Sequence, residues 1–103
     1  MTMIKSENGG TVRIADEVIA VIAGTAALEA EGVAQLAGST RKHRARGVQV
    51  QVKAQHVRLG IALSVKAGKK LQEVSREVQQ RVKSAIETMT GLQVDEVNVS
   101  VVA

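Results

Sequence analysis

Two histidines and three close pairs of carboxylates are the side chains of this sequence that could carry out chemistry. Nucleophilic catalysis needs a serine, threonine or cysteine with an oriented base beside it. His43 lies in a basic stretch and His56 in a predicted turn, so neither position favours a buried base. Cysteine is absent, and two histidines alone do not provide the ligands of a zinc site. We therefore interpret both histidines as exposed turn residues.

The carboxylate pairs are Asp16–Glu17, Glu29–Glu31 and Asp95–Glu96. The first pair stands at a predicted helix start, where negative charge is favourable beside the positive end of the helix dipole. The last pair stands where a turn enters a predicted strand. Because such positions are typical of structural acids, we predict no catalytic residues among them.

A short stretch, AGKK at 67–70, matches part of a phosphate-binding loop. The full pattern requires a glycine at position 63 and a hydroxyl residue at position 70. The chain has Leu63 and Lys70 there, and Gly68 is better explained as the break between a strand and a helix. We predict no enzyme activity, no metal site and no cofactor.

The basic stretch STRKHRAR (39–46) contains four cations and no acid, and these four equal the chain's net charge of +4. Contacts to four phosphates would give a salt slope of about −3.6, which is typical of weak, nonspecific binding. Aromatic residues make up 0% of the chain, so the stacking platforms of single-strand binders are missing. A solvated loop is the simpler interpretation, and binding to nucleic acid or anionic lipid is the alternative. The candidate anion-binding residues are Arg41, Lys42, Arg44 and Arg46.

The elements that would position these residues follow two hydrophobic periods. Apolar residues recur at every second position in 48–54, 57–65 and 97–103, which predicts strands with one buried face. Residues 11–14 favour a further short strand, and 33–37 form a short apolar segment.

Helical spacing of apolar residues predicts one helix from Asp16 to about Ala30 and a longer one from Lys69 to Thr90. The sum is an α+β fold: a single two-layer domain whose antiparallel or mixed sheet of about four strands has two helices packed on one face. We predict that residues 1–10 form a flexible N-terminal tail and that 11–103 form the domain.

Two predicted surfaces favour contacts with proteins. The first helix has a second apolar stripe, so it could be buried on both sides, either within the domain or against a partner. The far face of strand 57–65 carries small residues that another backbone could approach closely, unless that face is simply solvated. The candidate interaction residues are Val21, Thr25 and Leu28 on the helix and Arg58, Gly60, Ala62 and Ser64 on the strand.

The longest apolar stretch, 18–28, is too short to cross a bilayer, and the first ten residues have no secretory pattern. We expect a cytoplasmic protein whose membrane contact, if any, is peripheral and made through a partner.

Three stretches carry a family resemblance. They are GGTVRIADEVIAVIAGTAALEAEGV (9–33), GVQVQV (47–52) and the long run from Lys66 to Val102, in which MTGLQVDEVNV (89–99) is the most specific piece. In this order they resemble the alkaline shock protein family, small cell-envelope stress response proteins of Gram-positive bacteria. The similarity covers about 9–102.

The resemblance implies a non-enzymatic cytoplasmic protein linked to envelope homeostasis or to control of fatty-acid synthesis, in some members held at the membrane by a separate anchor protein. The chain departs from the family pattern in its short basic segment between Gly38 and Gly47 and in Val65–Ala67, which lack the usual acidic and aromatic residues. A partner of one relative therefore need not bind here. We hypothesise an adaptor or scaffold that acts through protein contacts or self-association into a homo-oligomer, with polyanion binding as the alternative.

The alternative is tested by replacing Arg41, Lys42, Arg44 and Arg46 together with glutamine. If the stretch binds phosphates, the substitution abolishes retention on immobilised DNA and on anionic vesicles, and wild-type binding weakens steeply with salt. Filter binding and vesicle co-sedimentation over a salt series measure both effects. A wild-type affinity that does not change with salt would exclude this mode of binding.

Overall fold

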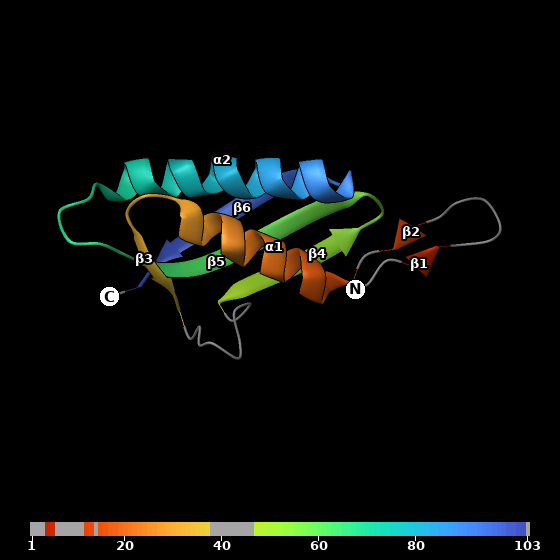
Figure 1. Cartoon of the computed structure of the whole chain (residues 1–103), viewed down its shortest axis with the longest axis horizontal. Coiled ribbons are helices and arrows are strands. Elements are labelled where there is room, and N and C mark those ends of the chain that lie inside the picture. Colours follow the sequence, from red (N-terminus) through yellow and green to blue (C-terminus); the bar gives the residue numbers. More distant parts are fainter. Residues whose placement is uncertain (1–3, 6–11, 14, 38–46, 103) are drawn as a thin grey trace.

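The computed structural model of the chain describes residues 4–5, 12–13, 15–37 and 47–102. Figure 1 shows the two helices lying side by side across one face of a sheet. The elements are β1 (Ile4–Lys5), β2 (Val12–Arg13), α1 (Asp16–Glu29), β3 (Val33–Leu36), β4 (Val48–Lys53), β5 (His56–Val65), α2 (Leu71–Thr90) and β6 (Gln93–Val101).

β5 is the central strand of a four-stranded mixed sheet. β6 runs parallel to β5 along one edge, and β4 runs antiparallel to it along the other edge. β3 is also antiparallel and pairs with the last residues of β5, beyond the end of β4, so β3 and β4 share one edge. The predicted α+β class, the mixed sheet of four strands and the two helices on one face are confirmed.

The membership of the sheet differs from the sequence pattern in one strand. Residues 33–36 form β3, although the pattern suggested only an apolar segment. The register of β3 on β5 shifts between Val33 and Gln35, so Val33 and Leu36 are both buried although they are three residues apart. Because of this irregularity, the strand does not show the alternation of buried and exposed residues that predicts a strand from sequence. β2, within the predicted strand 11–14, pairs instead with β1 in a separate two-stranded sheet. The boundary between a tail of 1–10 and a domain of 11–103 stays a prediction.

The core lies between the sheet and the helices and is wholly aliphatic. Alternation in β5 turns Val57, Leu59, Ile61 and Leu63 toward the helices, and all four are buried. α1 presents its alanines to the core, which lets this helix approach the sheet and α2 closely. The largest fully buried side chains are Ile19, Leu36, Ile61, Leu63, Ile86, Val57, Val78 and Val82.

Ala37 and Gly47, the described residues on either side of 38–46, both form a hydrogen bond with Ala62. The Ala37 N–H donates to the Ala62 carbonyl, and the Ala62 N–H donates to the Gly47 carbonyl, each at 2.8 Å. Gly47 has φ +86°, and a Cβ there would lie 2.6 Å from the Ala37 carbonyl oxygen. Glycine is therefore required at 47 both by backbone conformation and by close packing.

Replacing Gly47 with alanine should destabilise the fold more than the same change at Gly68. Gly68 has a similar φ of +84°, but its Cβ would meet nothing within 4 Å. Gly68→Ala thus measures only the left-handed strain, about 1–3 kcal/mol. Gly47→Ala adds a clash with backbone and should cost a further ~2 kcal/mol. Urea unfolding of both variants compares the two free energies, and equal losses would contradict the close approach at Ala62.

Candidate interaction surfaces

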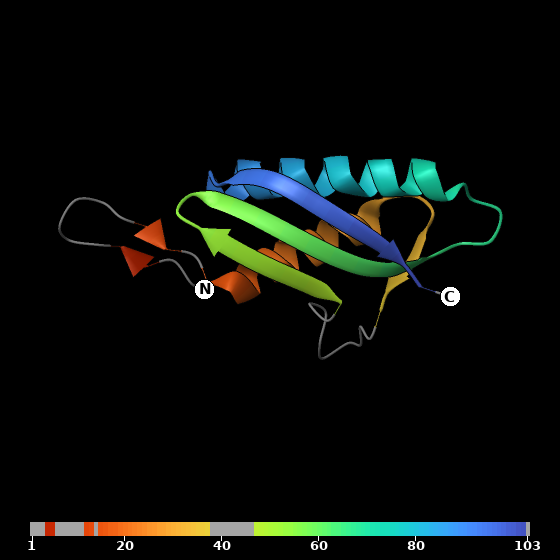
Figure 2. The same ribbon diagram turned by 180° about the vertical axis from the view of Figure 1, so that it is seen from behind.

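The outer face of the sheet is not covered by either helix, as the view from behind shows (Figure 2). The predicted residues Arg58, Gly60, Ala62 and Ser64 alternate with the buried residues of β5 and so lie on this face. The structure therefore brings this half of the predicted site together.

Small residues make the middle of the outer face hollow. Gly60 stands between Gln49 of β4 and Asn98 of β6, and Ala62 stands beside Ser100. The residues that line the hollow are Gly47, Gln49, Gly60, Ile61, Ala62, Asn98 and Ser100. Its rim consists of uncharged amide and hydroxyl groups, which can donate and accept hydrogen bonds but hold no charge.

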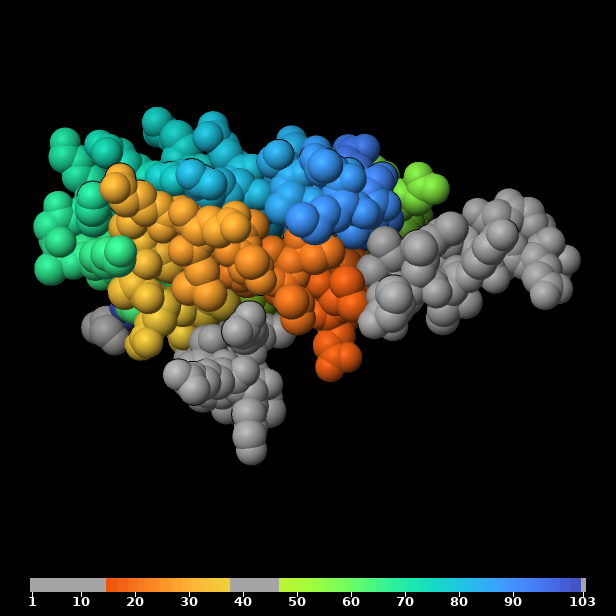
Figure 3. Space-filling model, viewed as in Figure 1, coloured from red at the N-terminus to blue at the C-terminus, as the bar shows by residue number. Residues whose placement is uncertain are grey.

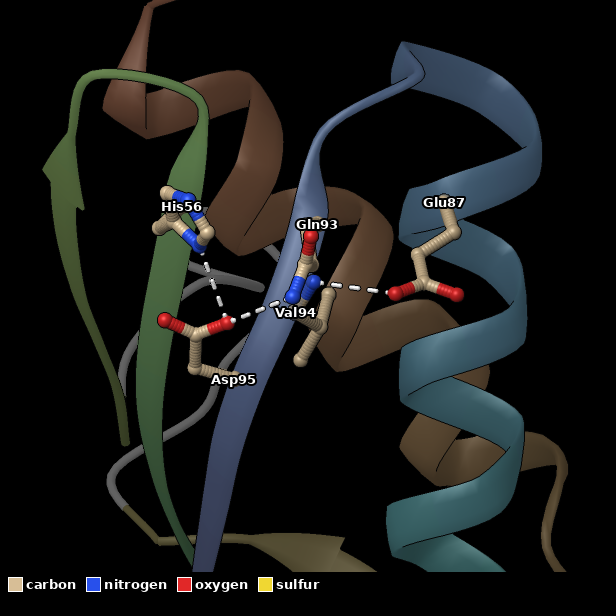
Figure 4. A network of polar contacts seen from close by, with 5 residues as sticks. All are labelled: His56, Glu87, Gln93, Val94 and Asp95. Atoms are coloured by element: carbon tan, nitrogen blue, oxygen red, sulfur yellow. Dashed lines mark hydrogen bonds and ion pairs between the residues drawn. The ribbon is translucent and has the colours of Figure 1, made fainter.

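Charged groups gather at the other end of the outer face, next to a bulge. The register of β5 on β6 passes from Val57–Val94 to Arg58–Glu96, so Asp95 is the extra residue. Figure 4 shows Asp95 turned toward His56, whose Nδ1 lies 3.0 Å from Asp95 Oδ1. The same carboxylate oxygen accepts a hydrogen bond from the Gln93 side-chain amide at 3.2 Å. His56, expected in a turn, is the first residue of β5 and is exposed.

The hydrogen bond from His56 lowers the pKa of the Asp95 carboxyl below its ordinary value of 3.8, with smaller contributions from Gln93 and Arg58. Partial desolvation opposes this shift. Because the folded-state pKa is the lower one, the contact stabilises the fold above the unfolded-state pKa. That contribution is lost as the pH falls through the folded-state pKa. In the described ranges no three His, Asp or Glu side chains gather as a metal site would require.

The second predicted surface, the apolar stripe on α1, is exposed. Val21 and Leu28 each keep 42% of their surface accessible, and Thr25 between them is exposed. α1 buries its other side, including Ile19 and Ala23, against the core. The interpretation that this stripe packs within the domain is therefore wrong for the described residues. α1 forms part of the outer surface of the helix layer in Figure 3.

The remaining predicted residues have separate outcomes. Asp16 and Glu17 lie in the first turn of α1, as expected of structural acids. The anion-binding candidates Arg41, Lys42, Arg44 and Arg46, and His43 with them, lie outside the described residues. No helix in the described part of the chain is long and apolar enough to cross a bilayer.

Two side chains of α2 that sequence reasoning did not single out bind the backbone of β6. The Gln79 amide donates to the Val97 carbonyl, and the Glu87 carboxylate accepts from the Val94 N–H, both at 3.0 Å. The Glu87 contact is drawn in Figure 4. An amphipathic pattern places both residues on the polar side of α2, and no signal in the sequence says which of them faces a strand.

A protein-family model matches residues 4–103 of the chain. The matching model is that of the alkaline shock protein 23 family, described by a cell envelope-related function. The chain belongs to this family, and the resemblance seen in the sequence is confirmed.

Similar proteins occur in Gram-positive bacteria. The uncharacterised protein YloU of Bacillus subtilis is 32% identical, over 89% of this chain and 86% of that protein. YqhY of the same organism is 31% identical, over 90% of this chain and 76% of its own length. An uncharacterised Streptococcus pyogenes protein is 30% identical, over 98% and 93% of the two chains.

Among solved structures, a MamM CTD variant matches 84% of this chain and 81% of its own, with a TM-score of 0.64 and 17% identity. The manganese form of another MamM CTD variant matches 86% of this chain and 99% of its own, with a TM-score of 0.57 and 15% identity. At these identities the likeness shows a shared fold alone.

Replacing His56 with alanine should raise the pKa of the Asp95 carboxyl toward 3.8, because the largest cause of its lowering is removed. A carboxyl-detected NMR titration measures the shift. The variant should also lose stability relative to wild type at mildly acidic pH, and this difference should vanish below the folded-state pKa. Gln93→Ala is the matched control and should move the pKa less. An unchanged Asp95 titration in His56→Ala would contradict the contact.

Proposed function

We propose that this chain is a non-enzymatic cell-envelope stress response and homeostasis protein that acts as an adaptor or scaffold. The family's cell envelope-related function supplies the context. The observation that carries the proposal is the apolar stripe of Val21 and Leu28, which α1 presents to solvent instead of to the core. Solvent-exposed apolar side chains aligned on one helix face are suited to docking on another protein.

A second surface on the opposite side of the domain gives the adaptor two separable contacts. The outer sheet face, centred on Gly60 and Ala62, faces away from α1 because both helices lie on the inner face. Its small residues admit close approach of a partner, and its amide rim offers hydrogen bonds. One surface can therefore serve self-association while the other binds a different protein, including a membrane-anchor protein on the cytoplasmic side.

Polyanion binding is the second candidate, favoured by the concentration of the net charge in the four cations of 41–46. Such binding is electrostatic and nonspecific, so it would add attraction to nucleic acid or to anionic lipid without selecting a partner.

Changing Val21 and Leu28 together to glutamate should abolish partner capture, because two charges would have to be buried in an apolar contact. The free energy of unfolding should change by less than ~1 kcal/mol, since both side chains are exposed. Affinity capture after nuclease treatment, with sedimentation velocity for self-association, measures the loss.

The matched control adds the same charge on α2, with Gln80→Glu and Thr88→Glu, both at exposed positions. This control should keep every partner. Unfolding of the α1 variant, or retention of all partners by it, would overturn the adaptor proposal.

A further inference from the structure

The edge of β6 that faces away from β5 is divided into two unlike halves. In a parallel pair, alternate residues of a strand direct both backbone groups to one neighbour. The Val102 N–H donates to the Leu63 carbonyl, so even-numbered residues near the end of β6 face β5. The odd-numbered residues Val97, Val99 and Val101 consequently direct their N–H and C=O groups outward.

The first half of this edge is occupied. Glu87 accepts from the Val94 N–H and Gln79 donates to the Val97 carbonyl. The bulge at Asp95 and the charges of Asp95 and Glu96 also lie here, and bulges and charges are means by which proteins prevent strand pairing at an edge.

The second half has none of these protections among the described residues. No strand or side chain in the described ranges bonds the outward groups of Val99 and Val101. The sequence from 97 to 102, VNVSVV, has no charge and no proline. Val101 and Val102 keep 40% and 39% of their surface accessible. An uncharged, unpaired strand edge in which apolar and polar residues alternate is a template for another strand.

α2, the helix beside this edge, leaves space for an additional strand and carries basic side chains. β6 diverges from α2 toward its C-terminal end in both views (Figures 1 and 2). A groove along this flank of α2 is lined by Leu71, Gln72, Ser75, Arg76 and Gln79. Leu71 is 52% exposed.

Two basic groups on this flank form no ion pair among the described residues. Arg76 lies one turn from Gln79, the residue that binds the edge. Lys83 lies one turn beyond Gln79 and lines the adjoining groove, which also contains Asp95 and Glu96. Among the described residues neither Arg76 nor Lys83 forms an ion pair, whereas Arg81 on the same helix pairs with Glu77.

We propose that the outer edge of β6 from Asn98 to Val102 accepts an extended peptide of a partner protein as an additional strand, with a carboxylate of that peptide bound by Arg76. This deepens the proposed adaptor function, on which it rests, by naming the kind of partner. The main-chain groups of Val99 and Val101 supply the hydrogen bonds of strand addition.

The surroundings of the edge define the side chains of the peptide. On the helix side it meets Val99, Val101 and the exposed Leu71, so apolar residues belong there, with one acid opposite Arg76. On the outer side it lies beside Asn98 and Ser100, so small polar residues belong there. The partner segment therefore alternates small polar with apolar residues and carries one glutamate or aspartate in the apolar register.

The probe is a synthetic nonapeptide of alternating threonine and valine in which one valine is replaced by glutamate. Amide NMR and hydrogen exchange of the full chain follow its binding. The expected result is slowed exchange of the Val99 and Val101 amides, which bond no described group in the free protein, with little change at β4. The same peptide with lysine in place of glutamate should bind about tenfold more weakly.

Two variants locate the contact. Val99→Pro removes one outward donor and no bond to β5, so it should abolish binding while the fold remains. Arg76→Glu should weaken the glutamate peptide about tenfold and strengthen the lysine peptide, which a merely structural role would not do. Lys66→Glu, a charge reversal at an exposed position that lines neither groove, is the matched control and should leave both affinities unchanged.

Three outcomes would overturn the proposal: no binding at millimolar peptide, protection at β4 alone, or Val99 and Val101 amides already protected in a dimer of the free chain. The last result would assign the edge to a second copy. None of them would affect capture through Val21 and Leu28, so the edge and the adaptor proposal can fail separately.

Discussion

The pairing of β5 on both of its edges is the constraint on which the rest of the structure depends. β5 contributes four fully or almost fully buried side chains to the inner face and pairs with three other strands. Its even-numbered residues bond β4 and β3, and its odd-numbered residues bond β6. A change that disturbs β5 therefore disturbs the core and both edges together, whereas each other strand of this sheet has only β5 as a neighbour.

The lack of aromatic side chains shapes how the layers pack. A core of valine, leucine, isoleucine and alanine is thin, and the alanine-rich side of α1 fits closely over it. Two helices cover one face of the four-stranded sheet, in which β3 and β4 share one edge of β5. Nothing in the described chain remains to cover the other face. The uncovered face consequently has polar side chains at its rim and small side chains at its centre, because the side chains there meet water rather than a second layer.

The polar contacts on the described surface affect the placement of side chains more than they affect the stability of the fold. The ion pairs between exposed groups, such as Arg81 with Glu77, each contribute little in water. Their geometric effect is greater: Asp95 is turned to His56 by the bulge, and Gln79 and Glu87 occupy one half of the β6 edge. Side chains of α2 thus decide which part of an edge strand is open, and this ties the helix layer to the surfaces of the sheet.

The sequence by itself determined the two helices, three of the four sheet strands and the faces of β5, because these follow from periods of 2 and 3.6 residues within single segments. It also placed Val21, Thr25 and Leu28 on one stripe and Gly60 and Ala62 on one face. Tertiary structure alone decided the membership of β3, since the shifted register at Gln35 breaks the period of two. It alone decided that the α1 stripe is exposed and that β6 is an edge strand beside α2. Those properties depend on which elements become neighbours, and the contacts that set them join residues such as Gln79 and Val97 that no local pattern connects.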